Sequence, residues 1–136
     1  MEENCLFCKV ARKELPAHII YEDADSLAFL DIHPKAPGHT VVIPKVHAQK
    51  ISALPEKLVG PVFQAVQKVA TRLSDVLAAD GLTIGINQGP VSGQTVPHLH
   101  IHLMPRFTGD HGGSIHSVVD NPPKETLESL KDRIKF

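Results

Sequence analysis

The chain has 136 residues, of which 14 are basic, 15 are acidic and 42% are hydrophobic, so its formal net charge is −1. This length predicts one domain spanning residues 1–136, and the composition excludes a polycationic nucleic-acid binder and a charged disordered chain. An acidic start, two cysteines and no apolar run long enough for a membrane span favour a cytoplasmic protein without a membrane anchor.

The first part of the chain predicts a short helix followed by three strands. Residues 5–15 place apolar side chains among charged ones and predict a short N-terminal helix. Residues 18–22 and 26–30 predict a hairpin, because a short Asp-Ala-Asp turn separates two β-prone segments. The prolines and the glycine of residues 31–39 predict a loop, and β-branched residues 40–43 predict a third strand that ends at Pro44.

A longer period marks the middle of the chain. Apolar residues three and four positions apart predict an amphipathic helix that begins near Pro55 or Pro61 and stops at Asp80-Gly81; they are Leu58, Val62, Val66, Val69, Leu73 and Val76. Residues 82–87 and 98–104 predict two more strands. Residues 124–136 predict a terminal helix behind Asn121 as its cap. The sum is an α+β fold, with an antiparallel five-stranded sheet, one long helix and short terminal helices.

Nine histidines stand out in a chain with one tyrosine and no tryptophan. In the segment from Pro97 to Leu103 they alternate with apolar residues, so a strand projects His98, His100 and His102 from one face. An exposed polar face does not require imidazole at every position. Two chemical hypotheses follow: the histidines bind a metal, or one of them is a nucleophile assisted by its neighbours.

The nucleophile hypothesis needs an anion site, because attack at phosphorus requires the phosphate oxygens to be held and neutralised. Residues 87–95, just before the histidines, form a glycine-containing segment suited to this purpose. Gly93 lets backbone N–H groups approach a phosphate closely, and Gln94 and Thr95 offer side-chain donors.

The run Gly93-Gln94-Thr95-Val96-Pro97-His98-Leu99-His100-Ile101-His102-Leu103-Met104-Pro105-Arg106 resembles the signature of the histidine-triad (HIT) nucleotide hydrolases and transferases. Residues 27–32 and 36–47 resemble that family in the same order. The resemblance covers about residues 5–106 and leaves residues 107–136 as a C-terminal tail. It implies a HIT-like fold, a homodimer, and attack by His100 on the α-phosphorus of a nucleotide. A covalent nucleotidyl-histidine then releases nucleoside monophosphate to water.

The same resemblance assigns roles to further residues. His102 is implied as the partner of phosphate oxygens or of the leaving-group proton, and His39 as a second histidine beside it. Asp31 is implied to accept the ribose hydroxyls, although a turn-capping carboxylate is its alternative. The wall of the base is implied to consist of five apolar residues, for which core packing is the alternative: Leu6, Phe7, Val10, Phe29 and Ile32. The phosphate is implied to contact Asn87, Gly93, Gln94 and Thr95.

Cys5 and Cys8 have the spacing of a metal-ligand pair, with a redox pair or two unrelated thiols as alternatives. Some branches of the HIT family share such a pair, and that resemblance implies a structural zinc site completed by His47 and His98. His100 then stays free for chemistry.

Two substrate classes follow from the resemblance. The Hint-like branch implies hydrolysis of purine nucleoside phosphoramidates and related conjugates. The alternative is hydrolysis of dinucleoside polyphosphates, as in the Fhit-like branch. Two other hypotheses remain open: a metalloenzyme whose catalytic metal is held by the three alternating histidines, and a non-catalytic nucleotide-binding module.

Overall fold

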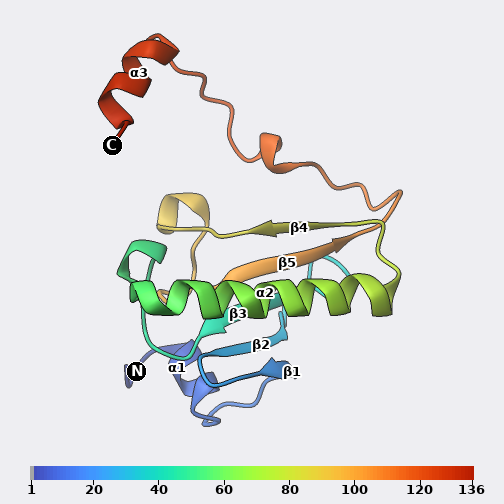
Figure 1. Ribbon diagram of the computed structural model, residues 1–136. Coiled ribbons are helices and arrows are strands. Elements are labelled where there is room, and N and C mark those ends of the chain that lie inside the picture. Colours follow the sequence, from blue (N-terminus) through green and yellow to red (C-terminus); the bar gives the residue numbers. More distant parts are fainter. Residues whose placement is uncertain (1) are drawn as a thin grey trace.

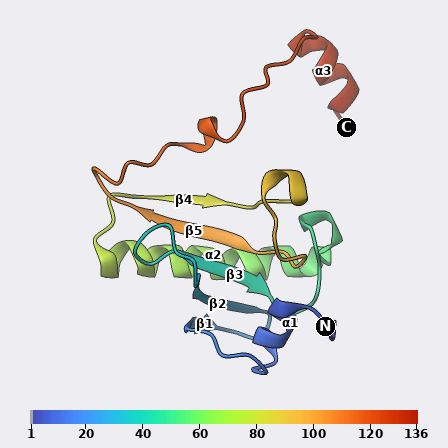
Figure 2. The ribbon, with the colours of Figure 1, turned by 180° about the vertical axis from the view of Figure 1, so that it is seen from behind.

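The computed structural model describes residues 2–136; Met1, which the predicted domain includes, lies outside the described residues. Five antiparallel strands form one sheet in the order β1-β2-β3-β5-β4. The strands are β1 (Ile19–Glu22), β2 (Ser26–Leu30), β3 (Thr40–Pro44), β4 (Gly81–Gly85) and β5 (Ile101–Arg106). The long helix α2 (Glu56–Leu77) covers one face, and the short helix α1 (Leu6–Ala11) lies on the other (Figures 1 and 2). The predicted α+β fold is confirmed.

The main core lies between α2 and the sheet. The apolar stripe of α2 is buried against residues of β3 and β5 and of the segment before β5, among them Val42, Leu99, Ile101 and Leu103. Burial of one such side chain contributes roughly 1.5–3 kcal/mol. Because neighbouring residues of an extended chain point to opposite faces, these leucines and the isoleucine fix the alternating histidines on the face away from α2.

A second, smaller core lies under α1. Val10 and Ala11 of α1 pack against the side chains of β2 and β3 that point away from α2, which are Leu27, Phe29, Val41 and Ile43. On the same face β5 presents His102, which pairs with Val41 of β3 and with Gly85 of β4. A Cβ at Gly85 would meet nothing within 4 Å. The histidine face is therefore covered on one side by α1 and open on the side of β4.

The predicted stop of the long helix and the predicted cap of the terminal helix are wrong. Of the two predicted starts of α2, the one at Pro55 is confirmed, and Pro61 lies inside the helix. It stops at Ala78, which adopts a left-handed conformation (φ 51°), whereas Gly81 already belongs to β4. Val76 is 66% exposed and does not join the core. The terminal helix α3 (Leu127–Ile134) is capped by Thr126 and not by Asn121.

Three boundaries also shift. The N-terminal helix ends at Ala11, well before residue 15, and Lys13 follows with a positive φ of 65°. The fourth strand begins and ends earlier than predicted, at Gly81 and Gly85. The fifth begins at Ile101 and not at residue 98, because pairing with β3 ends at Val42 and the Leu99 amide instead bonds the carbonyl of Ala48.

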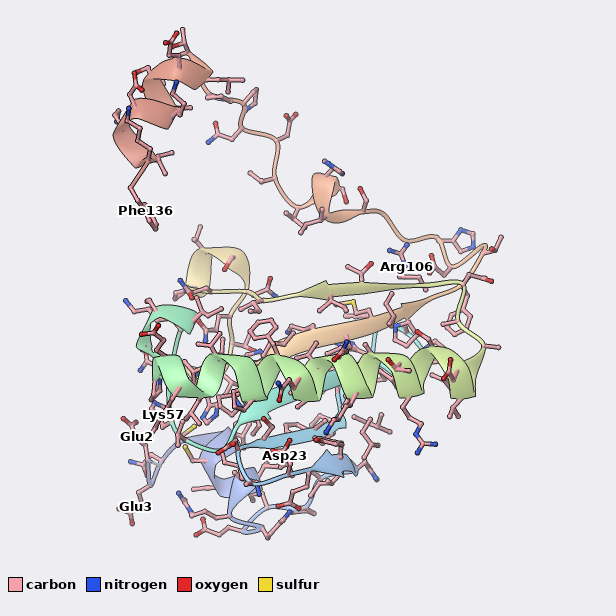
Figure 3. All side chains as sticks on the ribbon, viewed as in Figure 1. Glu2, Glu3, Asp23, Lys57, Arg106 and Phe136 are labelled. Atoms are coloured by element: carbon pink, nitrogen blue, oxygen red, sulfur yellow. The ribbon has the colours of Figure 1, made fainter. Side chains whose placement is uncertain are left out.

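The tail, residues 107–136, leaves the end of β5 and runs away from the sheet (Figure 1). Arg106 fixes its exit: the guanidinium bonds the Asp110 carboxylate, the Thr83 hydroxyl and the carbonyl of Gly113. Figure 3 shows Arg106 at the start of the tail and Phe136 at its far end. Among residues 2–136, no helix combines the length and the apolar character that a membrane span requires.

Candidate active site and metal centre

Four side chains from three distant segments converge beside α1. The Sγ atoms of Cys5 and Cys8 and one ring nitrogen each of His47 and His98 all lie within 4.8 Å of one another. Cys5 is the N-cap of α1 and Cys8 lies one turn later, so the helix itself brings the two thiols together. His98 Nδ1 lies 3.3 Å from Cys5 Sγ, and His47 Nδ1 lies 3.4 Å from Cys8 Sγ.

The donor set and its spacing fit a tetrahedral zinc site. Zinc binds sulfur at about 2.3 Å and imidazole nitrogen at about 2.0–2.1 Å, which separates the two ligand atoms by about 3.6 Å. The three sulfur–nitrogen distances of 3.3, 3.4 and 3.5 Å are close to this value. Burial raises the pKa of the Cys8 thiol, so a bound cation is what would favour its thiolate form. A redox pair would not require two imidazoles to converge on the thiols.

The ring of His98 is oriented for this site. Its Nε2 donates to the carbonyl of Pro44 at 2.8 Å, and since a carbonyl only accepts, Nε2 carries the proton and Nδ1 presents a lone pair to the thiols. Burial lowers the pKa of His98 to about 4, so the ring is neutral near pH 7. Both ring nitrogens are thereby engaged, which argues against one catalytic metal shared by His98, His100 and His102.

His100 has the opposite tautomer. Its Nδ1 donates to the carbonyl of His98 at 2.7 Å, so Nε2 is the nitrogen with the free lone pair. The ring is only 6% exposed. It packs edge-on against Phe7, with centroids 5.1 Å apart, and against His102, with centroids 5.0 Å apart. A buried imidazole with one fixed N–H and one free lone pair is what nucleophilic attack requires.

A chain of hydrogen bonds continues from His102 into the loop before β3. The amide of Lys35 donates to His39 Nδ1 at 3.1 Å, so the neutral ring carries its proton on Nε2. That nitrogen lies 3.0 Å from His102 Nδ1 and donates to it. The remaining proton of His102 is then on Nε2. Burial, and then the nearby rings of His100 and His39, lower the pKa of His102 to about 4.

Asp31, His39 and His102 also form a cluster of metal-ligand type, with ligand atoms within 4.8 Å of one another. The Lys35 amide argues against a metal there, because it holds the proton of His39 on the nitrogen that would have to bind the ion. Asp31 instead lies 3.6 Å from His39 Nε2, accepts the amide of His33 and opposes the burial that lowers the pKa of His39.

The five residues expected to wall a base fall into two groups. Val10 and Phe29 are 5% and 6% exposed and belong to the core under α1, so little of either can touch a ligand. Leu6 and Ile32 are exposed, at 49% and 75%, and Phe7 is half-buried between Phe29 and His100. The exposed pair and Phe7 are the ones available to a base.

The glycine-containing loop before the histidines is held by its own side chains. Gly93 has a φ of 99°, and Asn87 and Thr95 are exposed. Gln94 does not offer free donors as its sequence context indicated: its Oε1 accepts from Gly89, and its Nε2 donates to the carbonyls of Gln49 and Val96. An open cleft of about 460 Å³ lies between this loop and Gln49 and Lys50.

Several groups of the site could not be found in the sequence. The carbonyls of Pro44 and His98 and the amide of Lys35 select the tautomers, and backbone groups are the same in every residue. Glu2, whose carboxylate lies 3.6 Å from His47 Nε2, carries no pattern that distinguishes it from Glu3.

A family model described as the HIT domain matches residues 12–109. The matched range includes His39, His47 and the alternating histidines, whereas Cys5 and Cys8 precede it. Among curated relatives, Protein hit of Bacillus subtilis is 37% identical over 134 residues, which cover 97% of this chain and 92% of the relative. Adenylylsulfatase HINT3 of Arabidopsis thaliana is 32% identical over 110 residues, covering 81% of this chain and 56% of the relative.

Solved structures of other proteins share the fold of this chain. The histidine triad nucleotide-binding protein of Candida albicans is 29% identical, with a TM-score of 0.81 over 97% of this chain and 95% of that one. A HIT family hydrolase of Clostridium thermocellum is 37% identical, with a TM-score of 0.72 over 85% of this chain and 99% of that one.

Proposed function

The chain belongs to the HIT family, and from that premise we propose that it hydrolyses nucleotide conjugates at the α-phosphorus, with His100 as the nucleophile. The observation that carries this proposal is the 2.7 Å hydrogen bond from His100 Nδ1 to the carbonyl of His98, which directs the free lone pair to Nε2. Neighbouring donors on His102 and in the loop before the histidines can hold the phosphate oxygens.

The reaction has two steps. His100 Nε2 forms a bond to the α-phosphorus, and the phosphorus–nitrogen bond of the substrate breaks with its electron pair leaving on the amine, which takes up one proton from the solvent. Water then adds to the phosphorus and the bond to His100 breaks. Nucleoside monophosphate is released, and the attacking water gives one proton to the solvent, which balances the proton taken up by the amine. His100 Nδ1 keeps its proton and its bond to the His98 carbonyl throughout, which stabilises the cationic imidazole ring of the intermediate.

His102 acts in this scheme as a hydrogen-bond donor to a phosphate oxygen. Its pKa of about 4 makes it neutral near pH 7, so it is better suited to donate a hydrogen bond than to lose a proton completely. His39 positions it by donating to its Nδ1. Asp31, exposed to 23% at its side chain, is the proposed acceptor for the ribose hydroxyls.

We propose purine nucleoside phosphoramidates and related adenylyl conjugates as the substrates. The name of the Arabidopsis relative is adenylylsulfatase, which supports an adenylyl conjugate as the substrate. The name of the Candida protein supports a bound nucleotide. Dinucleoside polyphosphates are the alternative, and the same attack at the α-phosphorus would apply to them.

We propose zinc as a structural ion held by Cys5, Cys8, His47 and His98. The sulfur–nitrogen spacing and the fixed tautomer of His98 support this assignment. Zinc would cross-link three segments of the chain, and no step of the hydrolysis passes through it. Two cysteines are too few for a secreted disulfide scaffold, so we propose a cytoplasmic location.

Steady-state turnover tests this function. We expect release of nucleoside monophosphate from adenosine phosphoramidate, with diadenosine triphosphate compared in parallel to identify the substrate class. We expect His100→Asn to lower kcat by about 10³-fold or more, because the nucleophile is lost. The control is His18→Asn, at an exposed histidine outside the site, which keeps full activity. No turnover of either substrate by the wild-type protein would support the non-catalytic binding module instead.

We further propose that the chain forms a homodimer in which the tail of each copy contacts the other. Apolar side chains are exposed along the whole tail, at Ile115, Val118, Val119, Leu127 and Ile134. A surface segment of this kind is typical of a contact with a partner. Sedimentation equilibrium of Leu127→Asp/Ile134→Asp should show a weakened dimer, with Lys131→Gln on the same helix as the unchanged control. A monomeric wild-type protein would contradict the proposal.

A further inference from the structure

One ring nitrogen of the metal centre lacks a partner. His47 directs Nδ1 at Cys8 Sγ, 3.4 Å away, and its Nε2 is buried without a hydrogen bond to any described residue. His98, the other imidazole of the cluster, has its second nitrogen bonded to the Pro44 carbonyl. A histidine that binds a metal through Nδ1 must keep its proton on Nε2, and a buried N–H without an acceptor is costly.

The nearest anionic group is the carboxylate of Glu2, whose Oε2 lies 3.6 Å from His47 Nε2. This distance exceeds the roughly 2.7–3.2 Å of a hydrogen bond. The Glu2 side chain is 65% exposed, so a small rotation about its own bonds can bring the oxygen closer. In Figure 3 the side chain of Glu2 lies nearer the body of the molecule than that of Glu3.

The backbone of Glu2 is already tied to the same centre. Its amide donates to Cys8 Sγ at 3.3 Å, and its carbonyl accepts from Arg12 Nη1 at 3.3 Å and from the amide of Cys5 at 3.4 Å. These contacts hold the residue beside the thiols whatever its side chain does. The position of the carboxylate near His47 is therefore built into the turn that precedes α1.

We propose that Glu2 is a positioning residue of the metal centre, which accepts the Nε2 proton of His47 and so orients this ligand toward the ion. A carboxylate that bonds the outer nitrogen of a ligating histidine fixes its tautomer and makes it a better donor to the metal. The inference rests on the proposed zinc site and adds a residue to it that does not itself bind the ion.

Metal affinity, measured by competition between the full-length protein and a chromogenic chelator, tests the role of the side chain. We expect Glu2→Ala to weaken zinc binding by about 10- to 100-fold, and Glu2→Gln to weaken it less, since the amide oxygen can still accept the proton. The matched control is Glu3→Ala, which removes an equal charge from the neighbouring exposed residue and leaves the affinity unchanged. The backbone amide that bonds Cys8 Sγ is present in all three variants.

Two further measurements separate orientation of His47 from a general effect on folding. Thermal unfolding of the metal-free protein should be the same for Glu2→Ala and Glu3→Ala. In a His47→Cys background, where the ligand has no second N–H, Glu2→Ala should have no further effect on affinity. Wild-type affinity in Glu2→Ala, or an equal loss in Glu3→Ala, would overturn the inference and leave the zinc site standing. Failure of the wild-type protein to bind zinc would overturn both.

Discussion

His98 and His100 are two residues apart and identical in type, yet they present different nitrogens. The carbonyl of Pro44 holds the proton of His98 on Nε2, and the carbonyl of His98 holds that of His100 on Nδ1. The first ring therefore points Nδ1 at two thiols, and the second leaves Nε2 free for the proposed attack on phosphorus. One backbone carbonyl for each ring thus separates the proposed metal ligand from the proposed nucleophile.

The buried ring of His102 should make the free energy of unfolding depend on pH in the acidic range. His102 has a pKa of about 4 in the folded chain, against about 6.5 for histidine in an unfolded one. The unfolded state therefore binds this proton first as the pH falls. We predict that the free energy of unfolding decreases between about pH 6.5 and pH 4, and that this group has no such effect above that range.

Urea unfolding of the metal-free protein at several pH values measures this dependence. His102→Asn should have a shallower slope than the wild-type protein. The difference should be at most about 1 kcal/mol per pH unit, because the ring is only partly buried and its charge is screened. Equal slopes for His102→Asn and wild type would show that this ring is not responsible.

At the scale of elements, the loop between β2 and β3 is placed by its contact with the end of α2. Gly38 has a φ of 82°, and a Cβ there would overlap the end of Leu77 and come within 3.3 Å of Pro105. His39 is the next residue, so the same close approach positions the ring that donates to His102.

We predict that Gly38→Ala destabilises the protein by about 2–4 kcal/mol, because left-handed backbone strain and overpacking add. Activity should fall as well, since His39 moves with the loop. Gly81→Ala is the matched control: its Cβ meets only the Cβ of Arg106, at an ordinary 3.9 Å, and within a strand the exchange should stabilise by up to about 1 kcal/mol. Thermal unfolding of both variants decides; a neutral Gly38→Ala would contradict the assigned packing.

The elements and the residue types of the site could be predicted, but their ends and contacts could not. The spacing of Val62, Val66 and Val69 and the alternation around His100 are local patterns, and both predicted an element that forms, although β5 begins one residue after His100. Ala78 ends α2 because its backbone turns, not because of its residue type. The fifth strand starts late because Leu99 finds a distant partner in Ala48. Neither the backbone turn at Ala78 nor the bond between Leu99 and Ala48 can be predicted from a short stretch of sequence.

At the scale of the whole molecule, the proposed zinc site joins the N-terminal helix to the segments at His47 and His98. We predict that a strong chelator lowers the melting temperature. At free zinc about 100-fold above the dissociation constant, binding contributes about 2.7 kcal/mol to stability. Below the new melting temperature, turnover should persist, because His100 does not bind the ion.

Cys5→Ser is the control for this experiment, since a chelator should no longer change its melting temperature. Immediate loss of turnover in the folded, metal-free protein would instead support a catalytic metal. Differential scanning calorimetry and activity, measured on the same samples, distinguish the two outcomes.

Rapid quench of the wild-type protein with adenosine phosphoramidate, labelled at its phosphorus, tests the nucleophile most directly. We predict that the label becomes attached to the protein at least as fast as product forms, and that peptide mapping places it on His100. Turnover with no labelled protein at any time, or with the label on another residue, would contradict the proposed mechanism.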